Sequence, residues 1–233
     1  MKIGTKSILY GAHCFFIHPW FVARAWYKLY GFPWDPRLWA CFFFHDLGYI
    51  GKPNMDGPEG EQHPYLGAQI VSALFDGWDP EKPPHYKPWY NFCLYHSRFL
   101  AKQHLQNTST LCVADKYSFC ITPRWLYLFL VNLTGEIHEY MKLARASFEL
   151  NCYSDDVKEW HHNVCIYLEA WVREHKDGRP DTWTQTEGNH TEGCTCSRCG
   201  RSPAEAAVNF AAKSMEESNA IREKSVHSDE RVH

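Results

Sequence analysis

The sequence of 233 residues lacks an apolar stretch long enough to cross a membrane. Its longest apolar run, Trp125 to Leu133, is far shorter than the roughly 20 residues that a transmembrane helix needs. The first residues include two lysines but no long apolar segment and no small-residue cleavage site, so no signal peptide is expected. These absences predict a cytoplasmic protein without a membrane partner.

The sequence also lacks an excess of charge of either sign. It has 24 Lys and Arg residues against 27 Asp and Glu residues, a formal net charge of −3, and no long basic run. Nucleic-acid-binding proteins usually carry a strongly basic patch. The composition therefore gives no sign of a nucleic-acid partner, and it indicates no particular oligomeric state.

No segment alternates apolar and polar residues for long enough to predict a strand. Apolar residues instead recur at helical spacing, which predicts an all-α fold for residues 1–175. The expected helices are His18–Tyr30, Arg37–Leu47, Pro64–Phe75, Pro88–Lys102, Thr108–Phe119, Arg124–Leu133, Ile137–Leu150 and Asp155–Glu174. The Gly- and Pro-rich segments 48–62 and 76–87 are expected to be loops.

Residues 176–233 are polar and poor in aliphatic side chains, which predicts a linker and a weakly ordered C-terminal tail. Within them, Cys194, Cys196 and Cys199 follow His190 and could form a zinc site. No second ligand pair accompanies them, so a flexible, redox-sensitive thiol cluster is the alternative. The other cysteines are expected to be reduced thiols, because no secretion signal precedes them.

An adjacent histidine and aspartate, His45 and Asp46, end a very apolar predicted helix within CFFFHDLGYIGK. A carboxylate buried there without a partner would cost several kcal/mol. A metal ion would supply the opposite charge. His18, His63, His96 and Asp115, which are ligand types for divalent first-row metals, lie on other predicted helices or helix starts and could converge in a bundle core, as metal ligands of helical bundles do.

The ordered pattern of these six residues resembles the HD-domain superfamily of metal-dependent phosphohydrolases. His18-x-x-x-Val22-Ala23 is similar to the first helix of that family, His45-Asp46-Leu-Gly to its eponymous motif, and Ala114-Asp115-Lys116 to its closing motif. His63-Pro-Tyr-Leu-Gly-Ala and the closing motif look most like the bacterial diadenosine tetraphosphate hydrolase branch. The resemblance covers roughly residues 10–130. It implies an HD-domain helical bundle and hydrolysis of a nucleotide or another phosphate ester by a metal-bound hydroxide.

The resemblance also implies the role of each ligand. His18, His45, Asp46 and Asp115 would hold one divalent ion, and His63, His96 and a bridging Asp46 would hold a second. Fe, Mn, Co and Mg are not distinguished. His13 competes with His18 for the first position, and His18 is preferred because Val22-Ala23 follows at the offset seen in the family.

Basic residues near the ligands are the candidates for binding phosphate. Arg98 and Lys116 are expected to act beside His45 and Asp46 in catalysis and to contact the substrate, and the further substrate-binding candidates are Lys52 and Arg124. The family usually has Lys or Arg after HD-x-G. This sequence has Tyr49 there, and Lys52 is the nearest basic residue.

Two other functions fit the same six residues. Some HD proteins, such as inositol oxygenase and phosphonate-cleaving oxygenases, hold a mixed-valence di-iron site and cleave a C–C or C–P bond with oxygen. A non-catalytic module that retains its metal site is the second alternative.

Overall fold

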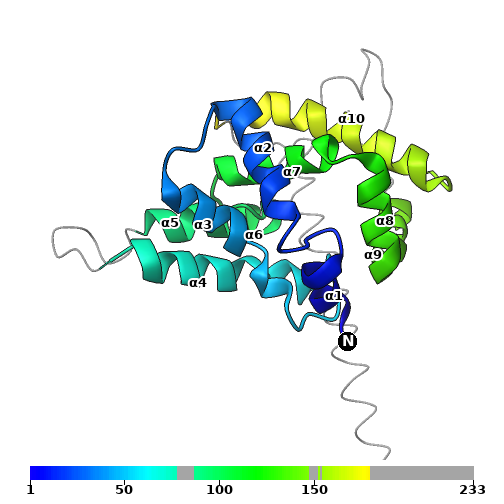
Figure 1. Ribbon diagram of the computed structural model, residues 1–233, viewed down its shortest axis with the longest axis horizontal. Coiled ribbons are helices and arrows are strands. Elements are labelled where there is room, and N and C mark those ends of the chain that lie inside the picture. The colour runs from blue at the N-terminus through cyan, green and yellow to red at the C-terminus, as the bar shows by residue number, and fades with distance from the viewer. Residues whose placement is uncertain (78–86, 147–151, 153, 179–233) are drawn as a thin grey trace, which may run out of the picture. The chain divides into compact units, whose positions relative to one another are not determined.

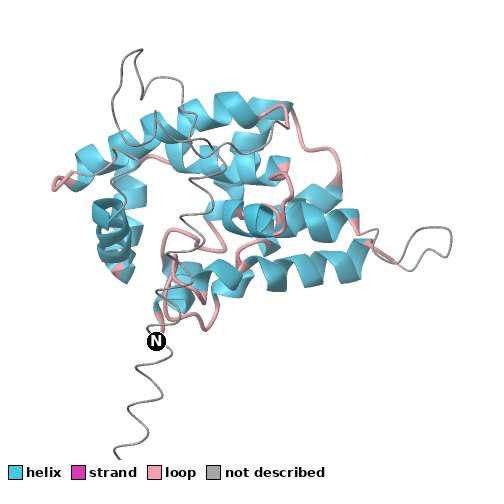
Figure 2. Cartoon of the chain, turned by 180° about the vertical axis from the view of Figure 1, so that it is seen from behind, coloured by secondary structure: helices cyan, strands magenta, loops and turns pink. Residues whose placement is uncertain are grey.

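The computed structural model describes residues 1–77, 87–146, 152 and 154–178. The described residues form α-helices, two short 3-10 helices and loops, and contain no strand (Figures 1 and 2), which confirms the all-α prediction. The elements are α1 (Ile3–Tyr10), α2 (His18–Tyr30), α3 (Pro36–Phe44), η1 (Leu47–Tyr49), η2 (Gly60–Gln62), α4 (Pro64–Phe75), α5 (Pro88–Leu94), α6 (Arg98–Gln103), α7 (Thr110–Ile121), α8 (Arg124–Thr134), α9 (Glu136–Ala146) and α10 (Val157–His175).

The chain divides into two units, Met1–Asp181 and Thr182–His233, and every described residue belongs to the first. The predicted linker and tail therefore lie, from residue 179 onward, outside the described residues. Of the helices in the described ranges, none is long and apolar enough to cross a membrane.

Proline and side-chain caps start several of the helices. Asp35 accepts a hydrogen bond from the Arg37 N–H at 2.9 Å, and Pro36 then opens α3 with a backbone angle that suits a first turn. Pro64 opens α4 in the same way. Both α2 and α4 have the bounds that the apolar periodicity predicts.

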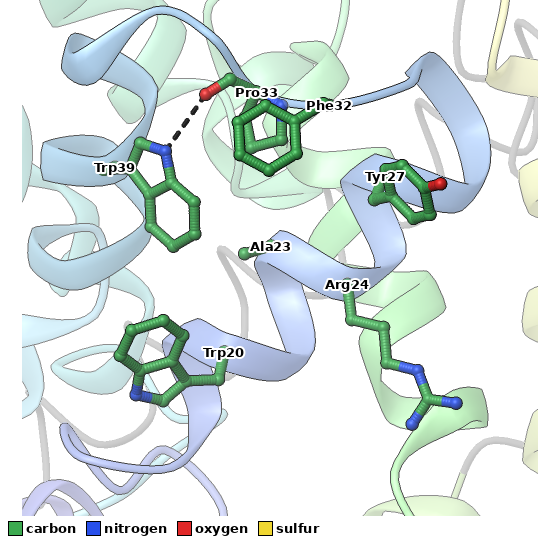
Figure 3. Close-up of a pocket in the computed structure, with 7 residues that line it drawn as sticks. All are labelled: Trp20, Ala23, Arg24, Tyr27, Phe32, Pro33 and Trp39. Atoms are coloured by element: carbon green, nitrogen blue, oxygen red, sulfur yellow. Dashed lines mark hydrogen bonds between the residues drawn. The ribbon is translucent and has the colours of Figure 1, made fainter.

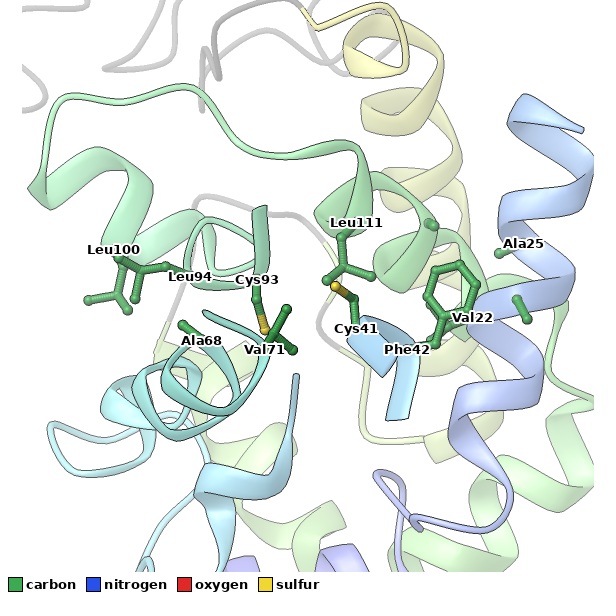
Figure 4. Close-up of a cluster of buried hydrophobic side chains, with 12 residues drawn as sticks. Val22, Ala25, Cys41, Phe42, Ala68, Val71, Cys93, Leu94, Leu100 and Leu111 are labelled. Atoms are coloured by element: carbon green, nitrogen blue, oxygen red, sulfur yellow. The ribbon is translucent and has the colours of Figure 1, made fainter. Parts of the chain in front are cut away.

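The main core lies where α2 packs on α7 and α4 packs on α5, with α3 beside them (Figure 1). Val22 of α2, Phe42 of α3, Val71 of α4 and Leu111 of α7 are fully buried in it (Figure 4). Each such side chain contributes about 1.5–3 kcal/mol when it leaves water. This packing fixes the helix ends that carry the predicted metal ligands.

The helix predicted over Pro88–Lys102 is two helices, α5 and α6, so this prediction was wrong in part. Ser97 has extended backbone angles, and its hydroxyl accepts the Leu100 N–H at 3.2 Å as the N-cap of α6. His96 lies in the break between α5 and α6, so a regular helix does not set the direction of its side chain.

Helix α1 was not predicted from the sequence. Gly4 in this helix fits directly against the carbonyl oxygen of Tyr49, and a Cβ at this position would overlap that oxygen. The Gly4 N–H donates to the carbonyl of Lys52 at 3.2 Å. Helix α1 thus packs against the backbone that follows His45-Asp46 and stabilises it.

Candidate metal centre

Each predicted ligand except Asp115 lies at a helix end or in a break between helices. His18 is the first residue of α2, His45 and Asp46 follow the last residue of α3, and His63 precedes α4. Asp115, by contrast, projects from the middle of α7. With His96 in the break between α5 and α6, five helices contribute to one centre. All six residues are buried or nearly so.

The first group joins His18, His45, Asp46 and Asp115. His18 Nε2 lies 3.3 Å from Asp46 Oδ2 and 3.1 Å from Asp115 Oδ1. His45 Nε2 lies 3.0 Å from Asp46 Oδ2 and 3.8 Å from Asp115 Oδ1. One ligand atom from each residue falls within 4.8 Å of all the others, so the group could hold a metal ion.

The second group joins Asp46, His63 and His96. His63 Nε2 and His96 Nε2 lie 3.5 and 3.4 Å from Asp46 Oδ1, and 3.1 Å from each other. Asp46 therefore presents one carboxylate oxygen to each group.

The outer nitrogens of three histidines are held by backbone carbonyls. Nδ1 of His45 lies 3.0 Å from the Phe42 oxygen, and those of His63 and His96 lie 2.7 and 2.6 Å from carbonyls three residues earlier. A carbonyl only accepts, so each Nδ1 carries hydrogen and Nε2 faces the centre. This arrangement orients imidazole rings for metal binding.

Several polar atoms of the centre have no ordinary partner in the described residues. His18 Nε2, His45 Nε2 and Asp46 Oδ2 are buried without a hydrogen bond of suitable geometry. The Nε2 atoms of His63 and His96, at 3.1 Å, need a proton or a cation between them because their lone pairs would repel. Buried polar groups are rarely left in this state, and a divalent cation would satisfy them.

The charges of the centre shift the pKa values of its members. Burial would raise the pKa of Asp46, but the charge of His45 holds it well below its ordinary value. Asp115 behaves in the same way, with Lys116 as the main cause of its lowered pKa. Burial would lower the pKa of His45, yet the two carboxylates raise it to about 10. Without metal, the centre therefore retains protons that a cation has to displace.

Two glycines let the ligand-bearing segments approach one another. A Cβ on Gly48 would overlap the carbonyl oxygen of His63, and one on Gly67 would overlap the carbonyl oxygen of Phe44 beside His45. These are backbone atoms that cannot easily move aside. Glycine at both positions therefore brings the two ligand groups together.

Tyr49, which stands where the HD family usually has a basic residue, is part of the wall of the centre. Its ring stacks on His63 at 3.9 Å between centroids and 11° between planes. It is buried, and its centroid lies 4.9 Å from that of His13. Tyr49 thus supports a predicted ligand and carries no charge toward a phosphate.

The four predicted basic residues lie in different surroundings. Lys116 Nζ lies 3.0 Å from Asp115 Oδ2, at the edge of the first group, and 35 % of the Lys116 side chain is exposed. Burial alone would lower the pKa of Lys116, but Asp115 raises it above its ordinary value. Arg124 is an exposed residue at the start of α8. Lys52 lies beside α1; the pKa of Glu59 is lowered mainly by a hydrogen bond from Asn54 and to a smaller extent by the charge of Lys52.

Arg98 is buried and directed toward α10. Its guanidinium donates to Tyr167 Oη at 3.0 Å and lies 4.6 Å from the centroid of Trp171. These contacts join the start of α6, two residues after His96, to α10. A contact between Arg98 and a substrate stays a prediction.

The acidic residue Glu139 of α9 was not singled out from the sequence. Its carboxylate accepts the backbone N–H groups of Met55 and Asp56 at 2.8 and 3.1 Å. The loop before His63 is thereby held from 83 residues away in sequence. The sequence around Glu139 does not predict this contact, because Glu139 looks like any other residue of an amphipathic helix.

A separate concavity lies on α2 and the segment leading to α3, and it contains none of the six predicted ligands. This open hollow has a volume of about 410 Å³. Trp39 Nε1 donates to the Pro33 carbonyl at its upper edge in the view of Figure 3, and Trp20 and Arg24 lie below. The candidate metal centre is therefore distinct from this aromatic hollow.

The two groups of the centre are the groups of His, Cys, Asp and Glu in the described ranges whose geometry could hold a metal ion. The predicted zinc ligands Cys194, Cys196 and Cys199 lie outside those ranges. The fold and the site together define an all-α protein with a buried His/Asp centre that could hold metal ions.

Comparison with protein-family models, with curated proteins and with solved structures gives no match. The geometry of the six side chains is what supports metal binding at this centre.

Proposed function

We propose that this protein is an HD-type metal-dependent phosphohydrolase acting on a nucleotide or another small phosphate ester. The observation that carries the proposal is the position of Asp46. Its Oδ2 faces His18 and His45, and its Oδ1 faces His63 and His96. A carboxylate between two sets of imidazoles is suited to holding two cations a few Å apart.

Divalent ions at the two groups would bind phosphate oxygens and lower the pKa of water toward neutrality. The chain's own part is to hold and orient them. Backbone carbonyls fix the imidazoles of His45, His63 and His96, and buried helix ends keep bulk water from the ligand atoms. Preorganisation of this kind avoids reorganisation when charge develops on the phosphate.

Lys116 is the basic residue best placed for the phosphate. Its ammonium is already held by Asp115 at the edge of the centre, and its side chain is partly exposed. Its raised pKa keeps it charged at neutral pH. A Lys ammonium acts as a point charge and needs no fixed bidentate geometry to bind a phosphate oxygen.

Phosphate release is the direct test. The purified protein is stripped of metal, reloaded with Mn²⁺ or Fe²⁺ and screened anaerobically with nucleotides and phosphate esters. We expect Asp46→Asn to lower kcat/KM by at least about 100-fold, beyond the 10- to 100-fold typical of groups that only support a ligand. His162→Gln, which changes an exposed histidine of α10, is the matched control and should leave the rate unchanged.

Oxygen consumption separates hydrolysis from the oxygenase alternative. A hydrolase releases phosphate in the absence of O₂, at the same rate as in its presence. Product formation that stops anaerobically and consumes O₂ in air would overturn the proposal. A His45→Ala variant with unaltered cellular function would instead favour a non-catalytic module.

A further inference from the structure

A buried carboxylate outside the metal centre organises the region next to it. Glu136, the first residue of α9, is 0 % exposed. Its Oε1 accepts the Thr134 hydroxyl at 2.6 Å and its Oε2 accepts the hydroxyls of Ser7 and Tyr140, both at 3.0 Å. Burial of a carboxylate is costly unless such donors satisfy it. Glu136 therefore joins Ser7, Thr134 and Tyr140 in one buried hydrogen-bond network.

The backbone near Glu136 is shaped to admit the carboxylate. The Ala12 N–H also donates to Oε1, at 3.3 Å. A Cβ on Gly11 would overlap that same oxygen, so only glycine allows the approach. The segment between α1 and α2 is thus shaped to accept the side chain of Glu136, which is 125 residues further along the sequence than Gly11.

Ser7 links Glu136 to His13 through hydrogen bonds. The single hydroxyl proton of Ser7 is donated to Glu136, so the Ser7 oxygen can only accept from other groups. It lies 2.9 Å from His13 Nδ1 and 3.3 Å from the His13 backbone N–H. Nδ1 of His13 must therefore carry hydrogen, which leaves Nε2 as an acceptor in the neutral ring.

The His13 ring lies at the side of the metal centre. Its centroid is 5.5 Å from that of His18 and 4.9 Å from that of Tyr49. Nδ1 faces Ser7, and among the described residues no hydrogen bond joins Nε2 to a partner. The His13 side chain is 22 % exposed, so it is not closed off from solvent. His13 belongs to neither ligand group.

We propose that His13 contacts the bound phosphate compound, with Nε2 accepting a hydrogen bond from a hydroxyl of that compound, and that Ser7 and Glu136 are its positioning residues. The inference rests on the proposed function, because it needs a phosphate at the centre. It adds the substrate class: a phosphate ester that presents an O–H donor beside the phosphate. The donor is either a sugar hydroxyl or the P–OH group of the phosphate itself.

Ligand binding by the Mn²⁺-loaded protein tests this, with calorimetry on inorganic phosphate and on ribose 5-phosphate. We expect His13→Phe to weaken binding by about three- to tenfold, the factor that one neutral hydrogen bond supplies. Metal content should be unchanged. An effect on both probes assigns the donor to P–OH, and an effect on ribose 5-phosphate alone assigns it to the sugar.

Matched variants separate positioning from general packing. Ser7→Ala removes the group that fixes His13, and we expect the same loss as in His13→Phe. Tyr140→Phe removes a hydrogen bond to the same carboxylate but leaves Ser7 and His13 joined, so its affinity should equal the unaltered protein's. If Ser7→Ala and Tyr140→Phe lost ligand affinity equally, the network would have only a structural role, and the proposal would be overturned.

The tautomer of His13 provides a test in the unaltered protein. Long-range ¹H–¹⁵N spectra should show hydrogen on Nδ1 of the His13 ring, assigned by the signal lost in His13→Phe. Hydrogen on Nε2 alone, or loss of metal in His13→Phe, would overturn the proposal. Failure of the unaltered loaded protein to bind either probe refutes the proposed function itself, whereas equal binding by that protein and His13→Phe refutes only the role of His13.

Discussion

Metal binding should stabilise the fold in two increments, one for each ligand group. The ligands come from the ends of α2, α3 and α4, from the break between α5 and α6, and from the middle of α7. Unfolding therefore disperses them, and a cation binds the folded state alone. At a free metal concentration of 100 times Kd, one such site stabilises by about 2.7 kcal/mol. Two independent sites give about twice that value.

The corresponding melting shifts are large enough to measure. For a unit of this size, each kcal/mol raises Tm by about 2–4 °C, so one site gives about 5–11 °C and two sites about twice as much. Circular dichroism melts with Mn²⁺, against a chelator baseline, record the shift. His96→Gln removes a ligand of the second group only and should retain one increment, while His162→Gln should retain both.

Either of two outcomes would contradict two separable metal sites. A Tm independent of Mn²⁺ concentration would mean that the centre does not bind metal in the folded state. Loss of both increments in His96→Gln would mean that the two groups do not act as separable sites.

Three further predictions concern protons, close packing and the core. The pKa of His45 is raised to about 10, so metal binding displaces protons and metal affinity should increase with pH from 6 to 9. Calorimetry in buffers of different ionisation enthalpy measures the protons released. A metal affinity that falls as pH rises would contradict this assignment. Gly67→Ala places a Cβ against the carbonyl oxygen of Phe44 and should lower the free energy of unfolding, measured with denaturant, by about 1–3 kcal/mol. Gly77→Ala is the control, because a Cβ there meets nothing within 4 Å, and it should lower this free energy much less. Equal effects of the two variants would show that the close approach at Gly67 is unimportant. Leu111→Ala empties a fully buried position and should lower the free energy of unfolding by about 2–5 kcal/mol; a loss below 1 kcal/mol would contradict the packing.

The sequence was informative wherever local rules decide the structure. The bounds of α2 and α4 followed from apolar spacing and from proline in their first turns. The order of His18, His45-Asp46, His63, His96 and Asp115 suggested one centre, and the structure brings these side chains together. The sequence reveals such a pattern because each ligand lies at the end of a predicted helix or is a polar residue within an apolar segment.

Features decided by distant contacts could not be predicted. The break between α5 and α6 depends on a cap at Ser97 within a segment whose apolar spacing suits one helix. The contact between Arg98 and Tyr167 joins residues 69 positions apart, so the sequence around Arg98 gives no sign of it. Glu136 and Ser7 are 129 residues apart, and neither residue alone suggests a buried network.

The metal stoichiometry tests the central claim most directly. The protein is saturated with Mn²⁺, freed of excess metal by gel filtration, and its metal content is measured against protein concentration. The account predicts two ions per chain in the unaltered protein and fewer than one in Asp46→Asn, because Asp46 serves both groups. One ion per chain, or two ions retained without the Asp46 carboxylate, would contradict a bridged two-metal centre.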